Sequence, residues 1–348
     1  MATGAPLTLV DQARRTDPNG DAADIAELLS QANDIYDDIT WKEGNTTDGE
    51  VFTVRTGIPA GTWRYLNAGV PMSKTTTAQG RVNCGILAAI SVIDREWLER
   101  YEDQMAARFE EDNGFLEGMS QTIASTMFYG SNLVNQAEFT GLSPFFNTLE
   151  TSTAANAANV FNGGGVGSNN ASIWLVGWSP RSVYGVFPKH SKAGLSAEPL
   201  PSGELAYDSL GNGYPSERTW FRQKAGLCVK DWRWVSRIAD LDVTSAGLAG
   251  PTPYDIFANM SKQLLRMPKM GRSQSAVTQT DAKSEMGLVV RPAFYCNRTV
   301  RSYMDIQIIR DKNVLIGMHD FAGMPAESFR GIPIRVNDVL LSTETVVS

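Results

Sequence analysis

Histidine and cysteine are scarce in this chain. Its 348 residues contain two histidines, His190 and His319, and three cysteines, Cys84, Cys228 and Cys296. The histidines are far apart and form no His-x-x-x-His pair, and the cysteines form no Cys-x-x-Cys pair. Zinc sites and disulfide frameworks usually carry such spacings. The sequence therefore predicts no metal site and no disulfide scaffold, with the cysteines reduced and buried.

Long apolar runs are also missing. The longest run before the first long helical pattern covers residues 85–90 and continues at Val92 and Ile93, far short of a membrane span. The N-terminus shows no basic stretch followed by an apolar one, as a secretory signal would. We expect an ordinary globular chain, made and used in a cytosol, with no membrane partner.

Catalytic signatures are missing as well. There is no Gly-x-Ser-x-Gly motif, and the glycine-rich run over 163–168 lacks the lysine of a P-loop. The acidic residues Glu99, Glu102 and Asp103 could pair carboxylates on one helix face, but a solvated charged face explains them as well. The sequence predicts no catalytic residue and no cofactor, and it predicts a loop at 163–168.

The net charge of −7 is unevenly distributed. Residues 1–150 hold 10 basic and 22 acidic side chains, a balance of −12, and the remainder holds 21 against 16, or +5. A protein that grips nucleic acid tightly is usually strongly basic, so any contact with DNA is expected to be non-specific. The asymmetry permits charge-complementary contacts between neighbouring copies, although a merely uneven surface is the commoner explanation.

One helical pattern persists longer than any other, from Asp94 to Tyr129. Its apolar residues recur at spacings of three and four, which places them on one stripe. Asp94 is the expected N-cap and Gly130 the expected stop, with a bend or break at Asn113-Gly114. The residues expected on the core face are Trp97, Tyr101, Met105, Phe109, Met119 and Ile123.

A β-hairpin is predicted between Trp41 and Thr77. Two β-favouring runs, 50–56 and 62–66, flank a Gly/Pro turn at 57–61. No third strand adjoins them, and an isolated hairpin is only marginally stable in water. The hairpin must therefore lie on its own core or on another subunit. The expected contact residues are Phe52, Val54, Trp63 and Tyr65.

The remaining chain alternates between helical and β patterns. Residues 21–39 predict a helix, packed on its own domain or docked on a neighbour, and residues 171–240 predict an antiparallel meander. After Gly250-Pro251 the pattern predicts a helix at 254–265, a strand at 293–296, a helix or strand at 298–309 and a last strand at 330–336.

Several stretches together resemble a known family, the major capsid proteins of tailed bacteriophages with the Hong Kong 97-type fold, in the short-tailed phage branch. The resemblance is nearly full length and is carried by stretches such as TVRTGIPAGTWRYLNAGV, MFYGSNLVNQAEFTGLSP, GLCVKDWRWVSRIADLDV and FRGIPIRVNDVL. It implies an α+β fold with an N-terminal arm (1–40), an E-loop hairpin (41–80), a P-domain (81–250) and an A-domain (251–348). The P-domain would hold a spine helix over 94–129 and strands over 171–240. The strands at 171–240 come earlier than the family pattern has them, which suggests a permuted chain order.

The resemblance also implies a function. Such a protein assembles with itself, as hexamers and pentamers, into the icosahedral shell that encloses a double-stranded DNA genome. It implies assembly in the host bacterial cytoplasm, a separate scaffolding protein, a portal protein and possibly a decoration protein as partners. Family members can carry lysine-to-asparagine cross-links, but nothing marks a partner for Lys42 or Lys74, so none is expected. Two alternatives stay open: an α+β enzyme or ligand-binding protein with an unrecognised site, and another virion component such as a decoration protein.

Overall fold

The computed structural model describes residues 31, 33–150, 153–201, 205–207, 211–244, 248, 254–268, 290–310, 317–321 and 324–347. Most of the helix expected over 21–39 lies outside these residues. Within them, α2 (Ile35–Asp38) is a single turn whose Ile35 is fully buried.

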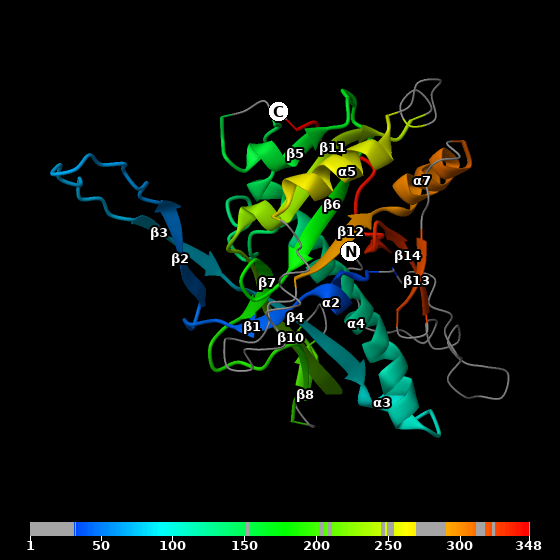
Figure 1. The fold of residues 1–348 in the computed structure, drawn as a ribbon. Coiled ribbons are helices and arrows are strands. Elements are labelled where there is room, and N and C mark those ends of the chain that lie inside the picture. The colour runs from blue at the N-terminus through cyan, green and yellow to red at the C-terminus, as the bar shows by residue number, and fades with distance from the viewer. Residues whose placement is uncertain are drawn as a thin grey trace.

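One large sheet organises the body of the molecule (Figure 1). Its hydrogen-bonded order is β13 (Gly317–Phe321), β14 (Met324–Phe329), β15 (Ile332–Val336), β12 (Arg291–Cys296), β6 (Asn170–Trp178), β7 (Val183–Phe187), β10 (Gly213–Val229) and β4 (Gly85–Asp94). Five further strands pair with members of this path: β1 (Trp41–Glu43), β5 (Val160–Asn162), β8 (Leu195–Pro199), β9 (Leu205–Tyr207) and β11 (Val235–Asp242).

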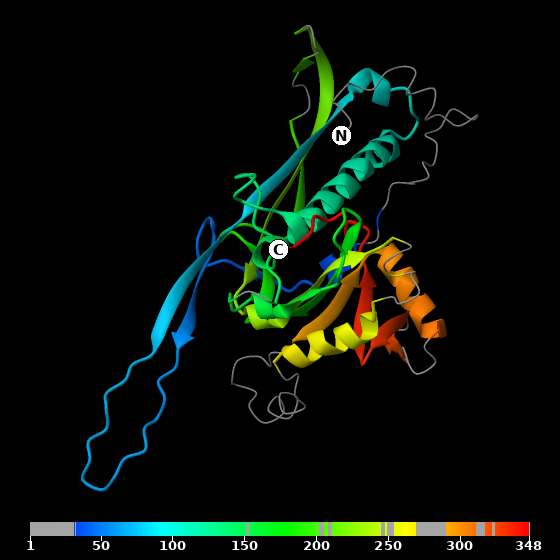
Figure 2. The same cartoon turned by 90° about the horizontal axis from the view of Figure 1, so that it is seen from above.

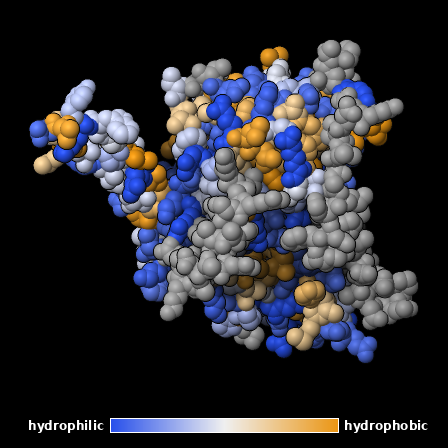
Figure 3. Space-filling view, viewed as in Figure 1, coloured by the Kyte–Doolittle hydropathy of each residue, from blue (hydrophilic) through white to orange (hydrophobic). Residues whose placement is uncertain are grey.

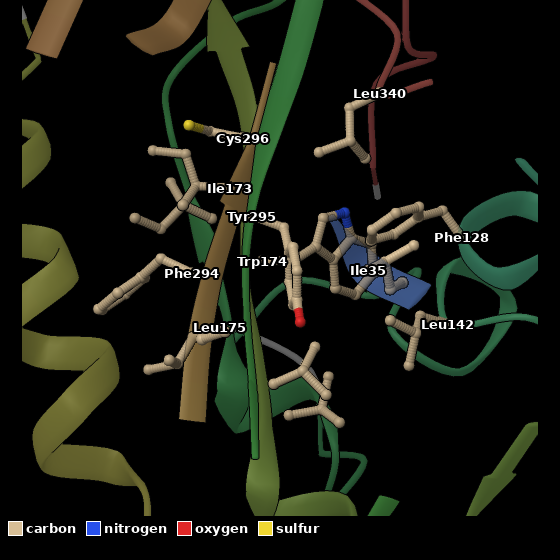
Figure 4. Packing of buried hydrophobic residues seen from close by; sticks show 14 of the residues in the cluster. Ile35, Phe128, Leu142, Ile173, Trp174, Leu175, Phe294, Tyr295, Cys296 and Leu340 are labelled. Carbon is tan, nitrogen blue, oxygen red and sulfur yellow. The ribbon is translucent and has the colours of Figure 1, made fainter. Parts of the chain in front are cut away.

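The core is built around β6, which is buried along its whole length. A strand covered on both faces reads as a continuous apolar run, as SIWLVGW does. Figure 4 shows the two layers: Trp174 points toward Phe128, and Ile173 points to the opposite side of the sheet. The ring centroids of Trp174 and Phe128 lie 6.2 Å apart. On the other side, Gln263 of helix α5 (Ile256–Arg266) donates to the carbonyl of Ile173.

The long helix begins later than expected. A single-turn helix, α3 (Arg95–Leu98), follows β4, and after a bend the long helix α4 runs from Gln104 to Tyr129. The helix restarts at Asp103, because its carboxylate accepts the backbone N–H groups of Met105 and Ala106 at 3.0 and 3.1 Å. The prediction of one helix from residue 94 was therefore wrong, whereas the predicted stop at residue 130 is confirmed.

A bend or break was predicted at Asn113-Gly114, and there is no break, because α4 continues through these residues. A glycine inside a helix lowers its stability by roughly 0.5–1 kcal/mol relative to alanine, but it keeps its backbone N–H and C=O groups. No atom lies within 4 Å of a Cβ built on Gly114, so no packing forces the helix axis to turn there.

The expected core face is only partly correct. Met119 and Ile123 are buried on α4, and Trp97 and Tyr101 are buried before it in a cluster with Ile93, Leu98 and Ala107. Met105 and Phe109 are instead 84% and 63% exposed. The bend at 99–103 resets the helical phase, so the stripe that begins at residue 97 does not continue onto α4.

The hairpin exists, but its second strand was placed wrongly. β2 (Gly49–Gly57) pairs with β3 (Thr76–Asn83), from Gly49 opposite Asn83 to Gly57 opposite Thr76. The run 62–66 lies in the connection between them and forms no strand. This two-stranded sheet projects from the body as an arm (Figure 2).

The strands at 171–240 do not form a unit separate from the C-terminal part. β6 pairs with β11 on one side and with β12 on the other, so one sheet spans the expected boundary at residue 250. The predicted meander is also more complex, because β10 pairs with β4 along one end and with β7 along the other. α7 (Arg298–Arg310) follows β12 and resolves the helix-or-strand alternative as a helix.

Candidate interaction surfaces

The tip of the arm exposes several large apolar side chains. Trp63 is 101% exposed and Tyr65 is 88% exposed. The other exposed apolar residues there are Ile58, Leu66, Val70 and Met72. Figure 3 shows hydrophobic residues at the end of the arm, mixed with polar ones and away from the body. Large apolar side chains exposed close together mark a surface for another protein.

The root of the arm is packed on the body. Phe52, Val82 and Cys84 of the arm region pack against the buried cluster of Tyr184, Val186 and Cys228. This contact holds the base of the arm, whereas Val54, one pleat further out than Phe52, is already 37% exposed. The arm is therefore anchored at one end only.

An ion pair between exposed Lys42 and buried Glu50 lies at the root. Lys42 Nζ lies 2.8 Å from Glu50 Oε1 and 5.1 Å from the centroid of the Tyr184 ring. Burial raises the pKa of the Tyr184 hydroxyl well above its usual value and raises the pKa of the Cys228 thiol to about 11. These groups are neutral at physiological pH, so the cluster fixes the arm and supplies no nucleophile.

Among the residues that the structure describes, the sheet formed by β4, β10 and β8 is covered on one face only. Its inner face packs on α4, where Phe115 stacks on Phe221 at 6.1 Å. On the outer face Ile90 stands directly opposite Trp220 in the pairing of β4 with β10. Ile86 and Ile90 are 64% and 51% exposed. We call this outer surface, with Ile86, Ala88, Ile90, Val92 and Trp220, the open sheet face.

Side chains that could act in catalysis or bind a metal do not come together in the described part of the chain. No cluster of three or more His, Cys, Asp or Glu side chains there could hold a metal ion, and no helix there is long and apolar enough to cross a membrane. One open depression of about 560 Å³ is lined by residues that include Glu150, Tyr254 and Lys262. His190 lies in an exposed turn with a positive φ of 67°.

Residues 17–348 match the family model for the major capsid protein GP7. The chain belongs to the GP7 family of major capsid proteins. No curated protein matches this chain. Among solved structures, a chain of bacteriophage Epsilon15 is 28% identical, with a TM-score of 0.72 over 100% of this chain and 99% of that one.

Other phage-type shells also match. The capsid of bacteriophage JBD30 is 10% identical, with a TM-score of 0.48 over 96% of this chain and 99% of that one. The capsid of a native GTA particle is 10% identical, with a TM-score of 0.47 over 64% of this chain and 95% of that one.

Family membership settles the class of function. This GP7-family protein has the Hong Kong 97-type capsid fold and a structural, shell-forming role in a phage virion, and it is not an enzyme. Both the enzyme alternative and the decoration-protein alternative are thereby set aside. A protein that assembles with copies of itself is expected to leave some apolar surface uncovered in a single chain.

The four predicted contact residues do not share one surface. Phe52 is half-buried at the root of the arm, Val54 lies midway, and Trp63 and Tyr65 lie at the tip. Sequence reasoning missed the open sheet face. Its signal was the alternation of Ile86, Ile90 and Val92 with buried residues, which we had treated only as an apolar run.

Proposed function

We propose that this GP7-family protein builds its shell as hexamers and pentamers in which the arm is an E-loop that docks on a neighbouring subunit. The single observation that carries the proposal is the exposure of Trp63 and Tyr65 at the tip of a two-stranded arm. Aromatic side chains dominate interface energetics, so these two are the expected anchors.

The open sheet face is the surface that we propose receives the arm. The open sheet face carries Ile90 and Trp220, and the tip of the arm carries aromatic and aliphatic side chains, so both surfaces are apolar. The arm and the β4–β10 end of the sheet extend from the body in opposite directions (Figure 2), so the tip of the arm does not reach the open sheet face of its own chain. Burying apolar surface on both sides contributes roughly 25 cal/mol per Å², which suits a contact repeated around a closed shell.

The finer partners follow from the same proposal. The shell would enclose double-stranded DNA with non-specific contacts and would assemble in the host cytoplasm with a separate scaffolding protein and a portal protein. The regions would be an N-terminal arm (1–40), the E-loop (41–80), a P-domain with α4 and an A-domain, possibly in permuted order, with a decoration protein as a possible further partner. The acidic net charge of −7 supports loose rather than tight contact with DNA.

The test removes the tip. Replacing residues 57–66 with a short Gly-Ser linker should leave a soluble chain that unfolds cooperatively but forms no closed shells by electron microscopy. The double variant Trp63→Ser, Tyr65→Ser should act in the same direction. Its matched control is Leu133→Ser, Val134→Ser, because these residues are 96% and 88% exposed on a loop outside both surfaces.

The outcomes separate the alternatives. Normal shells from the linker variant would show that the arm is not the intersubunit contact. Loss of the fold would show that the arm belongs to its own core. If Ile90→Asp assembles normally while the tip variants do not, the arm docks somewhere other than the open sheet face.

A further inference from the structure

The outward face of α4 carries two large apolar side chains that the body leaves uncovered. Met105 and Phe109 are 84% and 63% exposed. They lie four residues apart, and Asn113 and Glu117 continue the same row along the helix. The buried face of this half of the helix uses Ala107 instead. Met105 and Phe109 therefore form a small apolar surface that the core does not use, and polar residues follow it along the row.

The N-terminal part of the chain already lies on this side of α4. The backbone N–H of Gln31 donates to Oε1 of Glu117 at 3.0 Å, and the hydroxyl of Tyr36 donates to the carbonyl of Ser120 at 3.2 Å. From residue 36 back to residue 31 the chain thus moves from Ser120 to Glu117, toward the N-terminal end of the helix. Phe109 lies further along in that direction.

The residues before Gln31 have the composition that such a surface needs. Residues 21–30 lie outside the described part of the chain. In the sequence, Ile25, Leu28 and Leu29 are three and four residues apart, which is the spacing of one helical stripe. Ten residues of helix span about 15 Å, and the eight residues from Glu117 to Phe109 span about 12 Å, so the segment is long enough.

We propose that residues 21–30 dock along the outward face of α4 of their own chain, with Ile25 and Leu28 covering Phe109. The occupant is the chain's own segment, because Tyr36 and Gln31 already contact Ser120 and Glu117 in turn, which leads toward Phe109. This inference goes beyond the shell-forming role and can be tested on unassembled subunits, so it stands or falls independently of the arm contact. It also decides an alternative that the sequence leaves open, whether this segment packs on its own domain or on a neighbour.

Photo-crosslinking tests the contact directly. The full-length chain is made with benzoylphenylalanine at position 25, as ¹⁵N-labelled and unlabelled protein, and the two are mixed and irradiated. The expected product joins position 25 to the peptide that contains Phe109, with both peptides carrying the same label. Mixed labels would show that a neighbour's segment occupies the surface, and crosslinks elsewhere or none would show that the surface is free; each would overturn the proposal.

Hydrogen exchange with matched variants gives a second test. Phe109→Ser should speed the exchange of amides in residues 21–30 about tenfold, because docking of the segment protects them. Leu133→Ser is the control, since it removes an equally exposed apolar side chain from a loop. Unchanged exchange in Phe109→Ser, or equal acceleration in both variants, would contradict the proposal. Ile25→Ser should reproduce the Phe109→Ser result from the other side of the contact.

Discussion

Arg237 and Glu344 form an ion pair inside the molecule, with Nη2 of the arginine 2.8 Å from Oε2 of the glutamate and side chains only 3% and 4% exposed. The hydroxyls of Ser172 and Tyr129 also donate to this carboxylate. Glu344 therefore joins β6, β11 and α4 to the C-terminal segment. A buried charge network of this kind is expensive to leave half complete.

Glu344→Ala should accordingly destabilise the chain strongly. The change leaves the Arg237 guanidinium buried without its counter-charge, and breaking a buried pair in this way costs about 3–5 kcal/mol. Glu344→Gln is the matched control, because it keeps an acceptor oxygen and removes only the charge. Its loss of stability should therefore be smaller than that of Glu344→Ala. Denaturant unfolding followed by tryptophan fluorescence measures both. A loss below about 1 kcal/mol for Glu344→Ala would mean that the network contributes no net stability.

Asp103→Ala should weaken the start of α4. The carboxylate accepts two backbone N–H groups there, and removing such a cap costs about 1 kcal/mol. Asp103→Asn preserves an acceptor and should lose only a few tenths of a kcal/mol. Thermal unfolding of the two variants side by side decides the point. If both variants lose the same amount, the charge of Asp103 rather than its hydrogen bonds is what matters.

The three thiols should react slowly in the folded chain. Burial raises the pKa of Cys84 and of Cys228 to about 11 and the pKa of Cys296 to about 12. At pH 8 the reactive thiolate is therefore a very small fraction of each. A colorimetric thiol reagent should label all three in denaturant and label the native protein much more slowly. Rapid labelling of the native chain would contradict the burial of these side chains.

The core could be predicted from the sequence where a run of residues has a single physical explanation. The run around Trp174 is almost continuously apolar, which indicates cover on both faces, and the structure places it at the centre of the sheet. The phase of α4 was not predictable from spacing, since Met105 and Phe109 continue the earlier stripe only if the chain stays helical through 99–103. Asp103 instead caps a new helix that begins after it, so the earlier helix does not continue.

The interaction surfaces were harder to predict for a different reason. The strand β3 is polar, with the sequence TTAQGRVN, because it lies on an exposed arm and needs no apolar face. Propensity therefore favoured the aromatic run at 62–66, although Trp63 is fully exposed and lies in no strand. We propose that other copies cover Ile90 and Trp63, and a single sequence carries no direct record of that geometry.

Asp240→Asn should stabilise the chain at neutral pH. Asp240 is 2% exposed, and burial raises the pKa of its carboxyl above the usual value. Its Oδ1 accepts the backbone N–H of Val347 at 3.0 Å, and an asparagine oxygen can accept the same bond. The residue also has a positive φ of 57°, which asparagine adopts with little strain.

The pH dependence of that gain follows from the sign of the shift. Because the folded pKa is raised, the folded state of the parent protein holds its proton to higher pH than the unfolded state, so the carboxyl opposes folding once it ionises. The difference in melting temperature between Asp240→Asn and the parent should be largest above the folded pKa and should shrink as the pH falls through it toward the unfolded value near 3.8. If the increase in melting temperature is constant with pH, it comes from the backbone alone and not from the ionisation of the carboxyl. A loss at neutral pH would show that the attraction of Asp240 to Arg237 outweighs the cost of its burial.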